Sequence, residues 1–311
     1  MGLTIPVSVT GPSIAGAQPS PCGTMSLGSV HYQHVIWVWM ENKSASDVIG
    51  SSQAPYINSL ARECGLATNY HNLTHPSLPN YVGATSGLPL SSLNQFLSDC
   101  NSSRSCSTTA SSIFSQGETW KAYEESMPKD CDKQNAGEYA VRHNPPPYFS
   151  RLSFCKPKKA VRHGPKVSDD VPYGQLPADL AANTLPAFSF VTPNLIHDMH
   201  DGTVVDGNAW LAANLPTILN SAEYRAGHVA VMITWDEGHP EDPSGENCVS
   251  DPPGTGCVVP TIVLSPSTPA GTISTTFFDH YSLLRTTESL LGRALLGQAA
   301  SAPSMASAFN L

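Results

Sequence analysis

The stretch HVIWVWMEN, residues 34–42, decides the fold. Its apolar run has the length of one strand, and a strand that is apolar on both faces is typical of the centre of a parallel sheet. The run ends at Glu41, which is the first charged side chain of the chain, and Asn42 follows it. We therefore expect a buried strand that places a carboxylate at one edge of a sheet.

The rest of the chain alternates between strand-like and helix-like segments. Strands are predicted at 34–40, 67–70, 188–192, 228–235 and 259–264, and helices at 56–63, 81–85, 208–219 and 281–291. This alternation predicts an α/β fold with a mainly parallel central sheet that is flanked by helices on both faces.

The sequence also suggests how the chain is divided. Residues 1–30 are rich in Gly, Pro and Ser, which predicts a flexible or surface-draped lead without an intact signal peptide. Residues 31–311 are expected to form a single domain, within which 98–175 form a disulfide-stapled insertion or cap. No stretch is long and apolar enough to cross a bilayer, and we expect a monomer.

Charge and cysteine content limit the class of protein. The formal net charge is −9 and no basic run occurs, which argues against a nucleic-acid partner. The cysteines include no CxxC pair, so a zinc ribbon is not expected. We therefore expect up to four disulfides, which implies an oxidising compartment and a secreted protein. Close spacing suggests Cys100/Cys106, Cys131/Cys155 and Cys248/Cys257, which leaves Cys22 and Cys64.

Acidic residues recur at the ends of predicted strands. Glu41-Asn42 end the first apolar run, Asp236-Glu237 end the run at 228–235, and residues 197–201, HDMHD, follow a third strand. In open α/β sheets the ligand crevice lies beyond the carboxyl ends of the strands. Converging carboxylates repel one another unless a cation joins them, which predicts a divalent metal ion such as Ca, Mg, Mn or Zn. The alternative is that these residues only cap loops and helices.

Ser77 is the candidate nucleophile. It lies between two prolines in THPSLPNY, residues 74–81, where a short helix is expected to begin. A hydroxyl at a helix N-terminus lies in a positive field that suits a phosphoryl group. The alternative is an ordinary N-cap serine. No GxSxG motif occurs, so a lipase-like triad is not expected.

Taken together, several motifs resemble a known family. They are ENKS, THPSLPNY, TPNLIHDMHDG, ITWDEG and FFDHYSLLRTTESLLG, in this order across most of the chain. The set is similar to the bacterial and fungal phosphoesterase family, which contains acid phosphatases and non-specific phospholipases C. The resemblance implies an alkaline-phosphatase-like fold and hydrolysis of phosphoric esters.

The resemblance also implies roles for individual residues. Ser77 matches the residue that attacks phosphorus, and a phosphoserine intermediate is expected. The metal ligands that it implies are Glu41, Asn42, Asp236 and Glu237, of which Glu237 departs from family members with a second Asp or a His. Asn42 is also expected to touch the phosphate, as are His143, His200 and His280. His143 and His200 are in addition expected to stabilise the leaving group.

The short chain favours small soluble phosphate monoesters as substrates. Two other functions stay open at this stage. One is phospholipase C activity on the head groups of lipid diesters. The other is a non-catalytic binding protein whose loops are held together by a metal ion.

Overall fold

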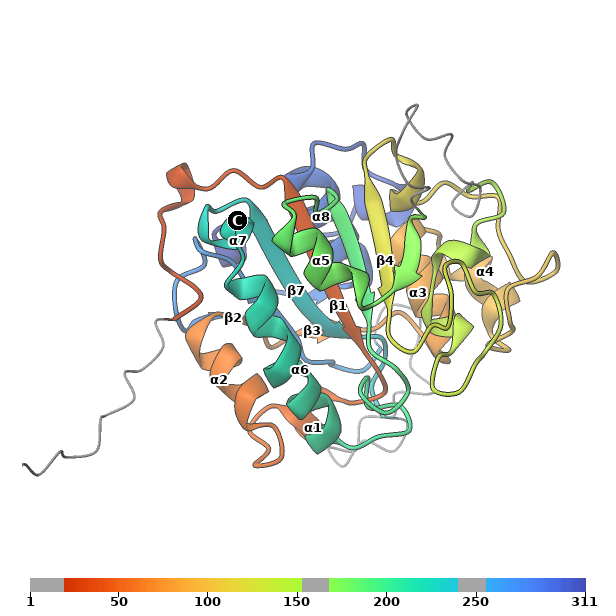
Figure 1. Ribbon diagram of the computed structural model, residues 1–311, viewed down its shortest axis with the longest axis horizontal. Helices are drawn as coiled ribbons and strands as arrows, with labels where there is room; N and C mark the ends of the chain where they lie inside the picture. The colour runs from red at the N-terminus through yellow and green to blue at the C-terminus, as the bar shows by residue number, and fades with distance from the viewer. Residues whose placement is uncertain (1–19, 153–167, 240–255) are drawn as a thin grey trace, which may run out of the picture.

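A computed structural model describes residues 20–152, 168–239 and 256–311. Its centre is an eight-stranded sheet with the order β5-β4-β6-β1-β7-β8-β2-β9 (Figure 1). The strands, in chain order, are β1 His34–Met40, β2 Gly65–Ala67, β4 Trp120–Glu124, β5 Asp170–Pro172, β6 Phe188–Thr192, β7 Val229–Trp235, β8 Thr261–Leu264 and β9 Thr272–Ser274. A small second sheet pairs β3 Tyr70–His71 with β10 Phe278–Asp279.

The sheet is mainly parallel, as the sequence predicts. The strands from β5 to β7 run parallel to one another, whereas β8 pairs antiparallel with both β7 and β2. The predicted α/β class with a mainly parallel central sheet is confirmed. The longest pairing joins β1 to β7 along their whole length, from His34 opposite Val229 to Met40 opposite Trp235. This register brings the carboxyl ends of both strands to the same edge of the sheet.

Helices cover both faces of the sheet. The helices are α1 Ala45–Val48, α2 Pro55–Glu63, α3 Ser77–Ser86, α4 Leu90–Leu93, α5 Gln175–Ala181, α6 Val204–Leu219, α7 Ala222–Arg225, α8 His280–Leu290 and α9 Ala306–Phe309. Figure 1 shows α2 and α6 in front of the sheet and α8 behind it. On that far side Trp37 of β1 donates a hydrogen bond from its indole to Thr287 of α8, at 2.9 Å.

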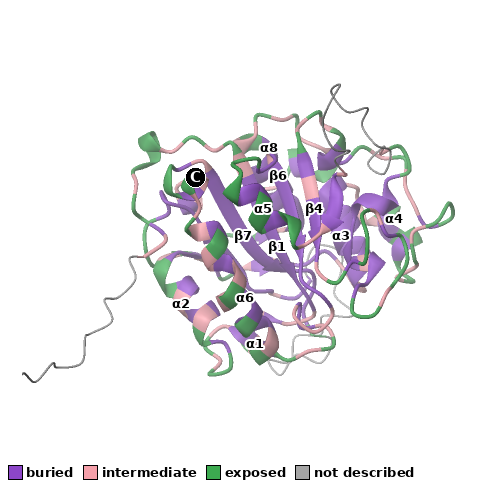
Figure 2. Cartoon of the chain, viewed as in Figure 1, coloured by how far each residue is buried: buried purple, intermediate pink, exposed green. Residues whose placement is uncertain are grey.

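The central strands are buried on both faces, which explains their continuous apolar sequence. Every residue of β7 is buried, and β1 is buried from Val35 to Met40 (Figure 2). Trp37, Trp39 and Phe190 pack together on these strands. Such a core fixes the strand ends rigidly, because close-packed aromatic side chains leave little room for adjustment.

Local signals explain where two helices begin. Helix α6 starts at Val204, four residues before the predicted 208, because Thr203 and Asp206 form a capping box there. Helix α3 starts at Ser77, before the predicted 81–85. Pro79 at its third position is compatible with a first helical turn, where the backbone N–H has no intrahelical partner.

The segment 98–175 was expected to be an insertion or cap. Its strands β4 and β5 are part of the main sheet, next to β6. The segment therefore extends the sheet, and no strand was predicted there because each run is short. The division of the chain into a lead and one domain stays a prediction, and much of the lead lies outside the described residues.

Two predicted disulfides are present. Cys22 bonds to Cys64 and Cys100 bonds to Cys106. Cys257 is also disulfide-bonded, but its expected partner Cys248 lies outside the described residues, as does Cys155. Among the described helices, none is both long and apolar enough to cross a membrane.

Candidate active site

The two acidic strand ends meet as the sequence predicts. Glu41 follows β1 and Asp236 follows β7, and the Asp236 N–H donates to the carbonyl of Met40 at 2.9 Å. Both carboxylates are fully buried. The Glu41 N–H donates to the carbonyl of Asp198 at 2.8 Å. The HDMHD loop after β6 is thus joined directly to the end of β1.

Asn42 turns the chain sharply after Glu41. Its φ is +51°, in the left-handed region that asparagine tolerates better than most residues. Its N–H donates to Asp236 Oδ1 at 3.1 Å. Asn42 Oδ1 and Asp236 Oδ2 are both buried without a hydrogen-bond partner of normal geometry among the described residues. Buried oxygen atoms in this state are costly unless they bind a group from outside the chain.

Ser77 faces the Glu41 carboxylate. Its Oγ donates to Glu41 Oε2 at 3.1 Å, while the hydroxyl of Tyr81, one helical turn later, donates to Glu41 Oε1. Ser77 is the first residue of α3 and Pro76 holds the N-cap position. The alternative of an ordinary N-cap serine is therefore wrong, because its hydroxyl is turned to a carboxylate and makes no capping bond.

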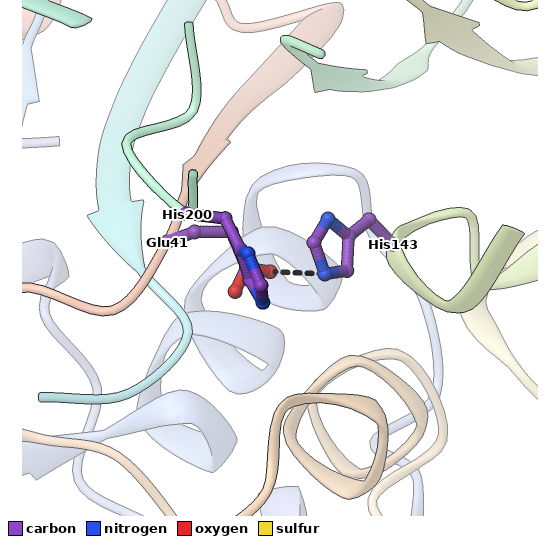
Figure 3. Close-up of side chains that lie close together, drawn as sticks. All are labelled: Glu41, His143 and His200. Carbon is purple, nitrogen blue, oxygen red and sulfur yellow. Dashed lines mark ion pairs between the residues drawn. The ribbon is translucent and has the colours of Figure 1, made fainter. Parts of the chain in front are cut away.

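His143 is held between two carboxylates. Its Nδ1 lies 3.1 Å from Asp198 Oδ2. Its Nε2 lies 3.3 Å from Glu41 Oε1 (Figure 3). Burial lowers the pKa of His143 well below its ordinary value, so the ring is neutral. When Nδ1 carries the proton and donates to Asp198, Nε2 faces Glu41 with a lone pair. Two acceptors at this distance need a proton or a cation between them.

His200 lies beside His143, and both of its ring nitrogens are engaged. Nε2 is 3.0 Å from Arg142 Nη2, and Nδ1 is 2.6 Å from Asp201 Oδ1. Its backbone N–H donates to Asp198 Oδ1 at 2.7 Å. His200 is therefore in the site as predicted, but in this arrangement its ring offers no nitrogen to a leaving group.

Glu237 and His280 lie at the margins of the site. Glu237 Oε2 is 2.9 Å from His75 Nδ1 and 3.3 Å from Asn80 Nδ2, so its carboxylate joins the turn that carries Ser77. His280 lies behind Asp236: its Nε2 is 2.7 Å from the Asp236 carbonyl, and its Nδ1 is 3.0 Å from the Tyr70 hydroxyl. With both nitrogens used, His280 holds the end of β7 and does not present the phosphate contact that the sequence predicts.

The carboxylates of the site share one electrostatic property. Burial raises the pKa of Glu41, Asp198 and Glu237 well above the ordinary range, and it raises the pKa of Asp236 to about 7. The negative charge of Asp236 raises the pKa of the other three further. Without a cation this group holds protons, and with one it can be fully ionised.

These residues fit a divalent cation in two overlapping ways. One ligand atom each from Glu41, His143 and His200 lie within 4.8 Å of one another. The second set consists of Glu41 with the unpartnered oxygens of Asn42 and Asp236. Oxygen donors suit Ca, Mg or Mn, and a mixed oxygen and imidazole set suits Zn or Mn.

Other residues of the site carry weaker signals in the sequence. Asp198 lies within the HDMHD stretch, and its carboxylate contacts the ring of His143 and the backbone N–H of His200. Tyr81 and Arg142 were not singled out. Tyr81 lies one turn from Ser77 within SLPNY, and Arg142 precedes His143. Spacing along a helix could have indicated Tyr81, whereas the partner of Arg142 is 58 residues away and no local pattern indicates it.

A comparison with protein families shows to which family the chain belongs. The model of the phosphoesterase family matches residues 37–292, which include all the site residues above. The chain belongs to the phosphoesterase family. This phosphoesterase is a hydrolase that acts on phosphoric ester bonds, and it resembles acid phosphatases.

Similar proteins support this family assignment. The phosphoesterase is 30% identical over 292 residues to a phosphatidylinositol-3-phosphatase from Mycobacterium tuberculosis, with 94% of this chain and 87% of the relative covered. It is 24% identical to an acid phosphatase from Aspergillus fumigatus, with 91% of this chain covered. It spans only 60% of the length of that acid phosphatase.

Solved structures of similar fold share little sequence with the phosphoesterase. A protein of the alkaline phosphatase superfamily from Vibrio parahaemolyticus superposes with a TM-score of 0.59 at 15% identity, covering 94% of this chain and 76% of the other. The phosphonate monoester hydrolase of Agrobacterium radiobacter superposes with a TM-score of 0.55 at 13% identity, covering 89% and 77%. At such low identity these similarities show the alkaline-phosphatase-like fold alone.

Proposed function

We propose that this phosphoesterase is a secreted, divalent-metal-dependent phosphomonoesterase that forms a phosphoserine intermediate at Ser77. One observation carries the proposal. Ser77 Oγ lies at the N-terminus of α3 and donates to Glu41, a buried carboxylate at the edge of the sheet. Leu78 donates its N–H to Asp99 Oδ1 at 2.9 Å and Pro79 has no N–H, so it is the positive end of the helix dipole that favours a phosphoryl group at this point.

The first half-reaction follows from these contacts. Ser77 Oγ forms a bond to phosphorus, and the bond from phosphorus to the leaving oxygen breaks. Glu41 Oε2, 3.1 Å from Ser77 Oγ, is the acceptor for the serine proton. His143 Nε2 is 3.3 Å from Glu41 Oε1 and lies where it can pass this proton to the leaving oxygen. Asp198 holds the ring of His143 in the required orientation.

The second half-reaction restores the serine. Water attacks the phosphoseryl group, inorganic phosphate leaves, and Ser77 Oγ regains a proton. A divalent cation, when bound by Glu41, Asn42 and Asp236 with Glu237 nearby, lowers the pKa of the serine hydroxyl and neutralises phosphoryl charge. Both ring nitrogens of His200 are engaged, so we assign it no proton transfer.

The choice of a monoester over a diester rests on the relatives. Those named above are a phosphatidylinositol-3-phosphatase and an acid phosphatase, and both names denote phosphatases. Phospholipase C activity on a lipid diester is the alternative. Secretion is supported by the described disulfides and by the similarity to fungal acid phosphatases.

Ser77→Ala tests the nucleophile. We expect hydrolysis of 4-nitrophenyl phosphate to fall by roughly 10³-fold or more, because no other hydroxyl replaces the serine. Bound metal, measured by plasma mass spectrometry, and the melting temperature should change little. Ser86→Ala is the matched control, since Ser86 is a buried serine in the same helix whose hydroxyl donates to the Val82 carbonyl and accepts from the Leu88 N–H.

Acid quenching of the wild type during turnover should also leave a phosphate group on the peptide that contains Ser77. Normal turnover by Ser77→Ala would show that the nucleophile is assigned wrongly. Wild-type protein with divalent metal that hydrolyses neither monoesters nor diesters would favour the binding-protein alternative.

A further inference from the structure

Arg142 is a cation at the site that the chemistry above does not use. It lies on the short 3-10 helix Val141–His143, immediately before His143, and is half-buried. A guanidinium stays protonated in proteins and only donates hydrogen bonds. Arg142 Nη2 therefore donates to His200 Nε2, 3.0 Å away.

This bond fixes the tautomer of His200. Because Nε2 accepts from Arg142, the ring proton is on Nδ1, which donates to Asp201 Oδ1 at 2.6 Å. Through these two hydrogen bonds, Asp201 orients His200, and His200 in turn holds the Arg142 guanidinium. The backbone of His200 is itself held by Asp198, which also orients His143. Arg142 is thereby placed relative to the same carboxylate that positions the catalytic histidine.

The remaining donors of Arg142 have no hydrogen-bond partner among the described residues. Within the described parts of the chain, its only hydrogen bond is the one to His200, and it forms no ion pair. The absence of an ion pair is unusual for an arginine so close to carboxylates. Arg142 is near Asp99 and Asp198, since its charge opposes the rise in pKa that burial causes in both. Lys43 provides a contrast, since its Nζ donates to the carbonyls of Met199 at 2.8 Å and Asn42 at 3.2 Å.

We propose that Arg142 binds the non-bridging oxygens of the substrate phosphoryl group, with His200 as its positioning residue, and that this contact makes the site prefer dianionic monoesters. The planar guanidinium matches two phosphoryl oxygens at once. A monoester carries one more negative charge than a diester, so it gains more from a fixed cation among buried carboxylates. The inference rests on the proposed function, because it takes the ester to bind at Ser77.

Binding, not turnover, gives the test. In a Ser77→Ala background loaded with divalent metal, calorimetry would measure the affinity for methyl phosphate and for dimethyl phosphate. We expect Arg142→Met to weaken the binding of methyl phosphate by about tenfold or more and to bring the affinities for methyl and dimethyl phosphate closer together. Arg142→Lys keeps the positive charge but loses the paired donors of the guanidinium, so its affinity for methyl phosphate should lie between those of the parent and Arg142→Met. Arg225→Met is the control, because the Arg225 guanidinium donates to Asn220, on the α6–α7 connection.

His200 is tested by a double-mutant cycle. His200→Ala should weaken methyl phosphate binding by about threefold or more, and should add nothing when Arg142 is already Met, because its effect passes through the guanidinium. Guanidinium ion added to Arg142→Ala should restore part of the binding.

Unchanged methyl phosphate affinity in Arg142→Met would overturn the proposal, as would an equal loss for both probes. If the parent binds no dimethyl phosphate, weaker binding of methyl phosphate by Arg142→Met supports the proposal, and unchanged binding of methyl phosphate overturns it. Failure of the Ser77 assignment is seen separately, as turnover by Ser77→Ala.

Discussion

Two groups of buried carboxylates lie in the same sheet of this phosphoesterase, and only one is proposed to do chemistry. The first, the β1–β7 group, consists of Glu41, Asp198, Asp236 and Glu237. The second, the β4–β5 group, consists of Glu124 at the end of β4 and Asp170 at the start of β5. Burial is the main cause of raised pKa in both, and the pKa of Asp236 and of Asp170 is about 7 in each case.

The neighbours of the two groups differ. In the β4–β5 group, the amide of Asn144 donates to Asp170 at 3.0 Å and the hydroxyl of Thr192 donates to Glu124 at 3.3 Å. In the β1–β7 group, the neighbours are Ser77 at a helix N-terminus and the ring of His143. Burial alone therefore perturbs a carboxylate without making a catalytic site, and the reactive groups around it decide its use.

The largest expected difference is in catalysis. Asp236→Asn should lower kcat/KM for 4-nitrophenyl phosphate by roughly 10³-fold and reduce bound metal, because it removes a charge from the proposed cation site. Asp170→Asn should change kcat/KM by less than about fivefold, since Asp170 contacts no reacting group. Comparable losses of activity in the two variants, at equal melting temperature, would break the comparison.

The second prediction concerns the pH dependence of stability. In the folded state the pKa of Asp170 is about 7, against an ordinary value of 3.8. Between these values Asp170 holds a proton in the folded protein that it has released in the unfolded chain, so its contribution to stability is greatest below about pH 4 and falls as pH rises towards 7. The loss from this residue is on the order of 2 to 4 kcal/mol.

Urea unfolding from pH 4 to 8 would measure this effect. Asp170→Asn should flatten the decline, because the amide does not titrate. A decline that is equally steep in Asp170→Asn and the wild type would show that Asp170 is ionised in the folded protein and that its pKa is not raised.

A smaller effect is expected from Asp198, which contacts both histidines of the site. Asp198→Asn should lower kcat by about 10- to 100-fold, with the pH profile of kcat altered, because the amide no longer fixes the tautomer of His143. Asp206→Asn is the control, because the Asp206 carboxylate accepts hydrogen bonds from the N–H and hydroxyl of Thr203 at the start of α6. If Asp206→Asn lost as much kcat as Asp198→Asn, orientation of His143 would not explain the effect.

The smallest effect is expected from Thr192, which touches both regions. Its hydroxyl donates to Glu124 and lies 3.2 Å from the carbonyl of His143. Thr192→Val should cost about 1 kcal/mol in the free energy of unfolding, which is typical of one lost hydrogen bond. kcat should change by less than about threefold. A larger drop in kcat would show that the β4–β5 group helps to position His143.

Much of the site could be predicted because its members end buried strands or begin a helix. Glu41 and Asp236 follow apolar runs, and parallel strands carry their ends to the same edge, so their meeting needed only the fold class. Ser77 was predicted from its prolines and its motif. His280 was predicted to touch phosphate, but no local pattern shows that Tyr70 and the Asp236 carbonyl occupy both of its nitrogens.

The sequence by itself determined the α/β class, the central strands with their acidic ends, and the family. It also indicated Ser77 as the candidate nucleophile. Each of these is encoded in neighbouring residues. Only the tertiary structure decided which side chains meet across long stretches of chain. His143 reaches Asp198 over 55 residues and Arg142 reaches His200 over 58. The short strands β4 and β5 likewise gain their place from pairing with β6 and with each other. Contacts of this kind depend on packing of the whole chain, which no local pattern records.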